Sequence, residues 1–140
     1  MQIYRSSSEQ ETEEIGKAFA RSLAEHDFVA LYGEMGSGKT VFTRGFVSAL
    51  IPDARVSSPT YAILNVYEGN GIHVNHFDLY RVTSEDDLAS TGYDETIESG
   101  VTVCEWPEQV PEALPDSYWK ITFSKESETG RTLTVERIGV

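Results

Sequence analysis

The residues from position 33 to position 40 carry the clearest chemical signal in this sequence. They match the pattern G-x-x-x-x-G-K-[ST] at every defined position and read Gly33-Glu34-Met35-Gly36-Ser37-Gly38-Lys39-Thr40. Glycines in such a loop let successive backbone N–H groups point at one phosphate, because no Cβ obstructs the approach. The lysine brings positive charge to the β- and γ-phosphates, and the hydroxyl that follows it binds Mg²⁺. We therefore predict a nucleotide-binding loop from Glu34 to Val41, with the positive end of a helix that begins at Val41 directed at the same anion.

A nucleotide hydrolase of this kind also needs a carboxylate beside the metal, at the end of a buried strand. Two residues fit that description, since Asp78 follows the segment 72–77 and Glu105 follows the segment 101–104. Polar residues interrupt the first segment and the second is more apolar, but this pattern does not separate the two candidates. We expect both carboxylates to face Mg²⁺, one directly and one through water, because Mg²⁺ keeps several of its waters in proteins.

Five other residues have side chains suited to a nucleotide site, although each also has an ordinary structural interpretation. Thr60 lies in a Ser-Pro-Thr loop, where it could respond to the γ-phosphate as switch loops do or simply belong to a proline turn. Trp106 is suited to cover the nucleotide, to present an aromatic ring to a partner, or to pack. Arg44, Arg81 and Arg131 are candidate phosphate clamps, but any exposed arginine would look the same.

The histidines and the cysteine give no sign of a metal centre. His26, His73 and His76 lack the spacing of zinc ligands, so we interpret them as structural. Cys104 lies within a predicted strand and is interpreted as a small core residue; a single cysteine excludes an internal disulfide and suits a reducing cytosol. The sequence has no N-K-x-D guanine signature, no L-S-G-G-Q motif and no arginine-rich lid. These absences favour ATP over GTP.

The pattern of the first fifty residues predicts the elements that position the loop. Serines and glutamates between Ser6 and Glu14 predict a helix N-terminus, and one apolar face predicts that this helix runs to about Glu25. A short apolar run at 28–32 predicts a buried strand that leads into the loop. A second helix is expected at 41–50, where Pro52 stops it.

The rest of the chain alternates between hairpins, a short helix and a buried strand. We expect a hairpin at 61–67 and 72–78, a capping box with Ser84 and Asp87 opening a helix that ends at 91–93, a buried strand at 101–104, and a hairpin at 118–124 and 132–138. The whole pattern predicts an α/β fold. It is a P-loop NTPase-like single domain over residues 1–140, with a central mixed sheet flanked by helices and antiparallel hairpin additions.

Charge and composition exclude several classes of function. The 140 residues include 11 Lys+Arg and 23 Asp+Glu, so the formal net charge is −12. A protein that binds nucleic acid by itself needs a basic surface, because phosphate neutralisation supplies most of its affinity. We therefore expect no direct binding of DNA or free RNA. No apolar run approaches the ~20 residues of a membrane span and the N-terminus lacks a signal sequence, so we expect no membrane association and a cytoplasmic protein.

Four motifs in a fixed order give the chain a family resemblance. They are GEMGSGKT at 33–40, SPTY at 58–61, HFDLYR at 76–81 and EWPE at 105–108. Together they resemble the bacterial TsaE (YjeE) family, the small P-loop ATPases of tRNA threonylcarbamoyladenosine (t6A) biosynthesis. With the N-terminal helix and the C-terminal hairpin included, the resemblance covers nearly the whole chain. Glu34 and Met35 stand where the family often has Asp and Leu, which leaves the phosphate-binding backbone groups unaffected.

The resemblance implies a function and partners. Members of the family bind ATP and Mg²⁺, hydrolyse ATP weakly and act with the TsaB and TsaD proteins. Those partners transfer a threonylcarbamoyl group to N6 of adenosine 37 in tRNAs that read codons starting with A. A member is thus an accessory or regulatory ATPase that reaches tRNA only through the complex. The acidity of the chain agrees with this role, because it would limit direct tRNA contact and steer docking to a basic face of a partner.

The resemblance also implies roles in catalysis and metal binding. The loop amides and Lys39 would hold the phosphates, and Thr40 with Glu105 would bind Mg²⁺. Asp78 matches the Walker B-type acid of the family.

Four further residues take their expected roles from the same resemblance. Thr60 and Trp106 fall on the family's functional loops. Arg131 opens the last strand and would contact the nucleotide, and the residues around Ser8 would lie near the adenine.

Two other functions stay open on the residues alone. A small-molecule P-loop kinase would phosphorylate an acceptor at ~1–100 s⁻¹. A nucleotide-switched binding module would use ATP only to change its conformation.

Overall fold

Strands with apolar runs form the centre of the molecule. The computed structural model describes residues 1–24, 26–56, 63–82, 84–89 and 92–139. Within these ranges the strands form a seven-stranded sheet in the order β1-β7-β6-β2-β5-β4-β3. Their bounds are β1 Gln2–Ser6, β2 Phe28–Tyr32, β3 Leu64–Gly69, β4 Ile72–Asp78, β5 Val101–Glu105, β6 Tyr118–Lys125 and β7 Arg131–Ile138. The central pairs β6–β2, β2–β5 and β5–β4 are parallel, and the outer pairs are antiparallel.

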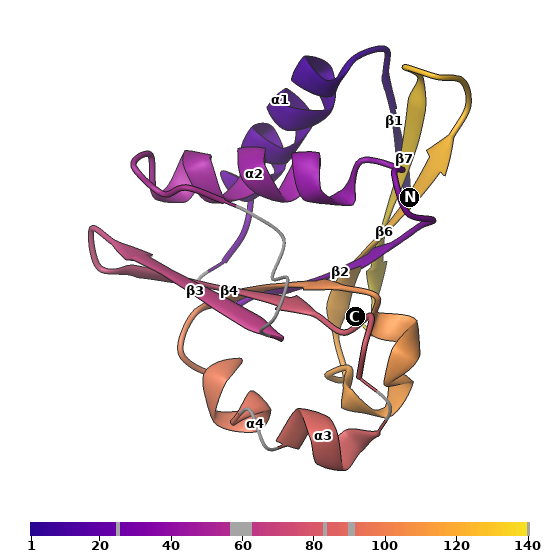
Figure 1. Cartoon of the computed structure of the whole chain (residues 1–140). Helices are drawn as coiled ribbons and strands as arrows, with labels where there is room; N and C mark the ends of the chain where they lie inside the picture. The colour runs from indigo at the N-terminus through magenta and orange to yellow at the C-terminus, as the bar shows by residue number, and fades with distance from the viewer. Residues whose placement is uncertain (25, 57–62, 83, 90–91, 140) are drawn as a thin grey trace.

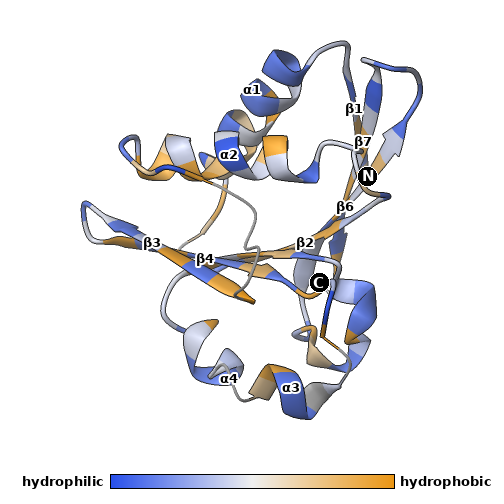
Figure 2. Ribbon diagram, in the orientation of Figure 1, coloured by the Kyte–Doolittle hydropathy of each residue, from blue (hydrophilic) through white to orange (hydrophobic). Residues whose placement is uncertain are grey.

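Helices cover both faces of this sheet (Figure 1). On one face lie α1 Glu9–Ala20 and α2 Lys39–Leu50; on the other lie α3 Glu85–Ala89, α4 Tyr93–Thr96 and two short 3₁₀ helices, η1 Pro107–Gln109 and η2 Pro111–Ala113. β2 and β5 are buried almost throughout, as strands covered on both faces must be. The colouring in Figure 2 places apolar residues along the sheet and polar residues on the outer side of the helices. The predicted α/β fold, a mixed sheet with antiparallel hairpin additions, is confirmed.

The first helix is shorter than the sequence predicted, and a strand precedes it. Ser8 is the N-cap, and its Oγ accepts a hydrogen bond from the Glu11 N–H at 3.1 Å. The prediction of an end near Glu25 is wrong, because α1 ends at Ala20 and the chain turns tightly from Arg21, where the Ser22 N–H donates to the Phe19 carbonyl. This strand, β1, was not predicted, and it pairs antiparallel with β7. Four of the five residues of β1 are exposed, so they give no apolar signal.

The other boundaries agree with prediction to within a few residues. The Asn70-Gly71 turn, with φ of 53° and 77°, joins β3 to β4, and positive φ at both positions is what a type I′ hairpin turn requires. The Asp87 N–H donates to Ser84 Oγ at 3.2 Å, which forms half of the expected capping box. α4 after Gly92 was not predicted. Residues 61–62 of the first predicted hairpin and Thr91 of the expected helix end lie outside the described residues.

Glycines allow α1 and α2 to cross at very short range. A Cβ on Gly45 would lie 2.0 Å from the Glu13 carbonyl oxygen, and a Cβ on Gly16 would lie 2.3 Å from the Phe42 carbonyl oxygen. No side chain fits at either position without a backbone shift. This crossing brings the N-terminus of α1 toward the loop that opens α2, so that both helices contribute to one site.

Candidate nucleotide-binding site

The loop between β2 and α2 has the backbone of an anion-binding cradle. Gly33, Gly36 and Gly38 have φ of 149°, 79° and 108°, a region that side chains rarely adopt, so glycine is needed at these positions. Gly38 is the N-cap of α2, which begins at Lys39, two residues earlier than predicted. Among the described residues, no side chain caps this helix end by a hydrogen bond, and the positive end of the helix dipole faces the loop.

Lys39 holds its ammonium group inside the site. Lys39 is 5% exposed. Its Nζ atom donates to the Gly33 carbonyl at 2.6 Å and lies 3.5 Å from the centre of the Trp106 ring. Burial lowers the pKa of Lys39, while the carboxylates of Glu105, Glu108 and Asp78 act in the opposite direction. A partly desolvated cation at the base of a glycine loop attracts phosphate oxygens strongly.

Two carboxylates lie beside this lysine at the ends of adjacent strands. Asp78 on β4 and Glu105 on β5 are paired across the parallel register. Thr40 Oγ1 donates to Glu105 Oε1 at 3.5 Å, whereas Asp78 Oδ1 accepts from the Tyr80 N–H at 3.0 Å. Glu105 therefore lies next to the Thr40 hydroxyl, the first side-chain hydroxyl of α2. The sequence alone did not show which of the two carboxylates, Asp78 or Glu105, would lie there.

The chemistry of this donor set fits Mg²⁺ better than a transition metal. In the described part of the chain, no group of three or more His, Cys, Asp and Glu side chains is arranged to hold a metal ion by itself. A hydroxyl and one or two carboxylates are the oxygen ligands that Mg²⁺ takes when substrate phosphates and water supply the rest. Thr40, Glu105 and Asp78 together offer such a set.

Replacing Asp78 with asparagine is expected to raise the free energy of unfolding of the nucleotide-free protein at pH 7. Burial raises the pKa of Asp78 above its ordinary value. A carboxyl with a raised folded-state pKa costs stability as the pH rises through that pKa, and costs none below the unfolded value of about 3.9. The gain from Asp78→Asn should therefore be present at pH 7 and shrink toward pH 4. Thermal unfolding across this range measures it.

The control for this variant is Asp53→Asn, which changes an exposed carboxyl after the end of α2. It should leave the unfolding temperature unchanged at both pH values. An equal gain from Asp78→Asn at pH 4 and at pH 7 would contradict the assigned cause.

Arg131 joins the β6–β7 turn to the phosphate loop. One guanidinium nitrogen donates to the carbonyls of Ser127, Glu128 and Gly130 at 3.1, 3.2 and 2.9 Å, and the other donates to the Gly36 carbonyl at 3.1 Å. Arg131 thus binds protein carbonyls on both sides and holds the two segments together. This contact fixes the distance between the loop and the far wall of the site.

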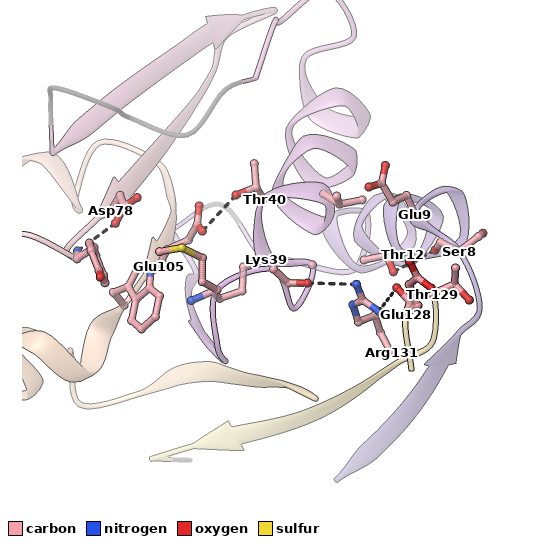
Figure 3. Close-up of a pocket in the computed structure, with 16 residues that line it drawn as sticks. Ser8, Glu9, Thr12, Lys39, Thr40, Asp78, Glu105, Glu128, Thr129 and Arg131 are labelled. Carbon is pink, nitrogen blue, oxygen red and sulfur yellow. Dashed lines mark hydrogen bonds between the residues drawn. The ribbon is translucent and has the colours of Figure 1, made fainter. Parts of the chain in front are cut away.

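These residues line one elongated cavity of about 680 Å³. Figure 3 shows Asp78, Glu105 and Lys39 at one end and Ser8, Thr12, Glu128 and Thr129 at the other, with the phosphate loop between them. Pockets for small ligands and cofactors span about 300–1,000 Å³, so this cavity has the size of a nucleotide site. Beyond the phosphate loop the cavity extends to residues of α1 and of the β6–β7 turn.

Comparison with known proteins assigns the family. A sequence model described as "Threonylcarbamoyl adenosine biosynthesis protein TsaE" matches residues 6–133. The chain belongs to the TsaE family. It is 32% identical to the tRNA threonylcarbamoyladenosine biosynthesis protein TsaE of Bacillus subtilis, over 97% of this chain and 85% of that protein. It is 34% identical to the TsaE protein of Treponema pallidum, over 93% of this chain and 96% of that protein.

A solved structure agrees with this assignment. The crystal structure of YdiB from Bacillus subtilis superposes with a TM-score of 0.80 at 26% identity, over 99% of this chain and 86% of that one. The fold of this TsaE-family chain is therefore a P-loop NTPase-like fold. No helix in its described segments has the length and apolar character needed to cross a bilayer.

Most site residues predicted from the sequence of this TsaE-family chain line the cavity. They are Ser8, Met35, Gly36, Gly38, Lys39, Thr40, Val41, Asp78, Glu105, Trp106 and Arg131. Glu34 and Ser37 are not among the lining residues, and Ser37 is buried within the loop. Thr60 lies outside the described residues.

Two of the candidate arginines lie elsewhere. Arg44 pairs with Glu13 on α1, with Nε 3.6 Å from Oε2. Arg81 is exposed and is not among the lining residues. Their interpretation as phosphate clamps therefore has no support in the cavity of this TsaE-family chain.

Five residues that line the cavity were not predicted as site residues; they are Glu9, Thr12, Tyr80, Glu128 and Thr129. Two of them had a usable signal, since Thr12 lies one helical turn after Ser8 on the same face and Tyr80 lies two residues after Asp78. The Tyr80 ring packs against Trp106 with ring centres 4.9 Å apart. The remaining three residues, Glu9, Glu128 and Thr129, lie on α1 and on the β6–β7 turn. They become neighbours only because the tertiary structure brings these two segments to the same cavity.

Proposed function

We propose that this chain, as one P-loop ATPase domain over residues 1–140, binds ATP with Mg²⁺, hydrolyses it weakly and supports t6A formation in tRNA. In this role it acts in the cytoplasm as an accessory ATPase with TsaB and TsaD. The complex attaches the threonylcarbamoyl group to adenosine 37 of tRNAs that read codons starting with A. The printed names of its relatives, tRNA threonylcarbamoyladenosine biosynthesis proteins, support the pathway.

One observation carries the ATPase proposal. The Thr40 hydroxyl and the Glu105 carboxylate lie 3.5 Å apart at the base of the glycine loop, beside the buried Lys39 ammonium. This is the combination of hydroxyl, acid and lysine that P-loop enzymes direct at a nucleoside triphosphate and its metal. A glycine-rich turn that served only to cap α2 would not need a hydroxyl, a carboxylate and a buried ammonium group together.

The geometry supports a role for each group in this proposal. The amides from Glu34 to Thr40 and the Lys39 ammonium hold the β- and γ-phosphates, and Thr40 and Glu105 would hold Mg²⁺. Bound there, Mg²⁺ would neutralise the charge that develops on the transferred phosphoryl group. Asp78, one strand away, orients water at the same site. We place Thr60 near the γ-phosphate on the basis of the sequence alone.

The accessory role follows from charge as well as from family. A net charge of −12 opposes direct tRNA binding, because the protein would have to hold phosphates against its own field. A partner that holds the tRNA removes this difficulty. We therefore assign tRNA contact to the complex and ATP binding to this chain.

Genetic complementation tests this function. Deleting the gene, with no second copy present, should deplete t6A from tRNA, as measured by mass spectrometry of tRNA nucleosides. Expression of the wild-type chain should restore it, and a pull-down should recover TsaB and TsaD in a manner that depends on ATP. Normal t6A in the deletion strain would contradict the proposal, and phosphorylation of a small-molecule acceptor by the purified chain would favour a kinase instead.

A further inference from the structure

His76 and Glu105 form a buried contact directly behind the candidate metal site. The His76 Nε2 atom lies 2.5 Å from Glu105 Oε2, and the two side chains are 0% and 4% exposed. An ionised carboxylate, the form that binds a metal ion, only accepts hydrogen bonds, so with Glu105 in that form the Nε2–H group of His76 is the donor. The other oxygen of Glu105, Oε1, accepts from Thr40. The two oxygens of one carboxylate are therefore divided between a histidine behind the site and the hydroxyl in front of it.

The sheet explains why this histidine reaches this carboxylate. His76 and Asp78 are alternate residues of β4, so their side chains point to the same face of the sheet. In the parallel register Asp78 lies beside Glu105 and His76 lies beside Val103, two residue pairs further from the loop. His76 reaches Glu105 diagonally across the two strands, at a separation that long side chains span.

We infer that His76 is a positioning residue, which orients the Glu105 carboxylate so that Oε1 is presented to Mg²⁺ beside Thr40. The inference rests on the proposed function, since it requires that Glu105 bind the metal. Carboxylates that ligate metals are held by hydrogen bonds from a surrounding shell, and loss of such a partner typically costs 10–100-fold in metal affinity or activity. Without the histidine, Glu105 would be free to rotate away from Thr40.

A purely structural role does not account for His76. The neighbouring position on the same strand face is Val74, which is fully buried in the apolar core. His76 occupies the next such position, yet its Nδ1 has no hydrogen-bond partner among the described residues. Leaving a buried polar atom unpaired costs about 1–3 kcal/mol. The contact with Glu105 is what the imidazole provides and what an apolar side chain would not.

Two amide variants test the contact without introducing charge. The side-chain nitrogen of glutamine lies about as far from the backbone as Nε2 of histidine. The asparagine side chain is one methylene shorter, so its nitrogen does not reach Glu105. The quantity to be measured is ATP affinity, by titration calorimetry in the presence of Mg²⁺ and, separately, of EDTA. His76→Asn should lose about 10-fold of the affinity gain that Mg²⁺ provides, while His76→Gln should retain it. ATP affinity in EDTA should be the same in both variants and in the wild type.

The control variant is Asn75→Ala on the same strand. Asn75 is buried and points to the opposite face, where its Nδ2 donates to the Thr96 carbonyl at 2.9 Å and to Ser99 Oγ at 3.3 Å. Its loss should lower the unfolding temperature and leave the Mg²⁺ dependence of ATP affinity intact. The control thus separates damage to β4 from damage to the metal site.

The outcomes distinguish this inference from the function on which it rests. If Mg²⁺ does not strengthen ATP binding to the wild type, the metal site itself is wrong. If it does, and His76→Asn keeps the full gain, the role of His76 is wrong and the metal site stands.

A measurement on the wild-type chain covers the case in which both variants fail to fold. ¹⁵N NMR of labelled histidines should show His76 protonated on Nε2. Its resonance should move when Mg²⁺ is added to the ATP complex and should not move with ATP in EDTA. An unchanged resonance would overturn the inference.

Discussion

Lys39→Ala is expected to weaken ATP binding by about 100-fold or more. The ammonium is the cation at the base of the loop, and two hydrogen bonds from a charged group to phosphate oxygens contribute about 1.5–3 kcal/mol each. Alanine removes both bonds and leaves Glu105, Glu108 and Asp78 without the positive charge that now faces them. The phosphates would then enter a site of like charge. Calorimetric titration with ATP measures this loss directly.

The fold should survive this substitution. Burial lowers the pKa of Lys39, which means that the charged ammonium is held at a cost in folding free energy. Replacing it with alanine removes this desolvation cost and also removes the hydrogen bond to the Gly33 carbonyl. Lys17→Ala is the matched control, since Lys17 lies on α1 outside the cavity, in a surface ion pair with Glu14 at 3.4 Å. It should bind ATP as the wild type does. Tight ATP binding by Lys39→Ala would show that the loop is not the phosphate site.

Glu105→Gln is expected to separate nucleotide binding from hydrolysis. The amide preserves the shape of the side chain, and its oxygen can still accept from His76, so the buried contact is kept. The negative charge that would hold Mg²⁺ beside Thr40 is lost, however, and a metal contributes several kcal/mol of transition-state stabilisation. We expect hydrolysis to fall on the order of 100-fold while ATP binding in EDTA changes little. Phosphate release, measured with the chain alone and with TsaB and TsaD, provides the readout.

Glu108→Gln is the control for this variant. Glu108 also acts on Lys39 through space, but it is exposed and does not line the cavity. A similar loss in both variants would mean that Glu105 acts only through the general field and not as a ligand. Retention of partner binding by Glu105→Gln, together with loss of t6A formation, would show that hydrolysis, and not nucleotide binding alone, is required.

The parts of the fold with strong local signals were predictable. β2 and β5 are short apolar runs bounded by turn residues or acids, and the structure places them at 28–32 and 101–105. The Asn70-Gly71 turn is determined by residues that tolerate positive φ. β1 and α4 were missed for the opposite reason. An exposed edge strand and a four-residue helix are stabilised by their neighbours, so their own sequences carry little pattern.

The choice between Asp78 and Glu105 shows the limit of local pattern. Both are acids at the ends of buried strands, and the sequence gives them equal standing. Their difference lies in strand order and pleat, since β5 is the neighbour of β2 and places the Glu105 carboxylate beside the N-terminus of α2. His76, which we interpreted as structural, acquires a contact with Glu105 for the same reason.

The sequence alone determined the phosphate loop of this protein, because binding there depends on backbone amides, glycines and one lysine that are contiguous in the chain. The family could also be predicted from the sequence, since four short motifs occur in the same order as in the TsaE family. Only the tertiary structure decided which carboxylate faces Thr40, that Arg131 binds the Gly36 carbonyl, and that α1 and the β6–β7 turn close the far end of the cavity. Those relations join residues far apart in the chain, 95 positions apart for Arg131 and Gly36. They depend on strand register and on the crossing of α1 over α2, which no local pattern encodes.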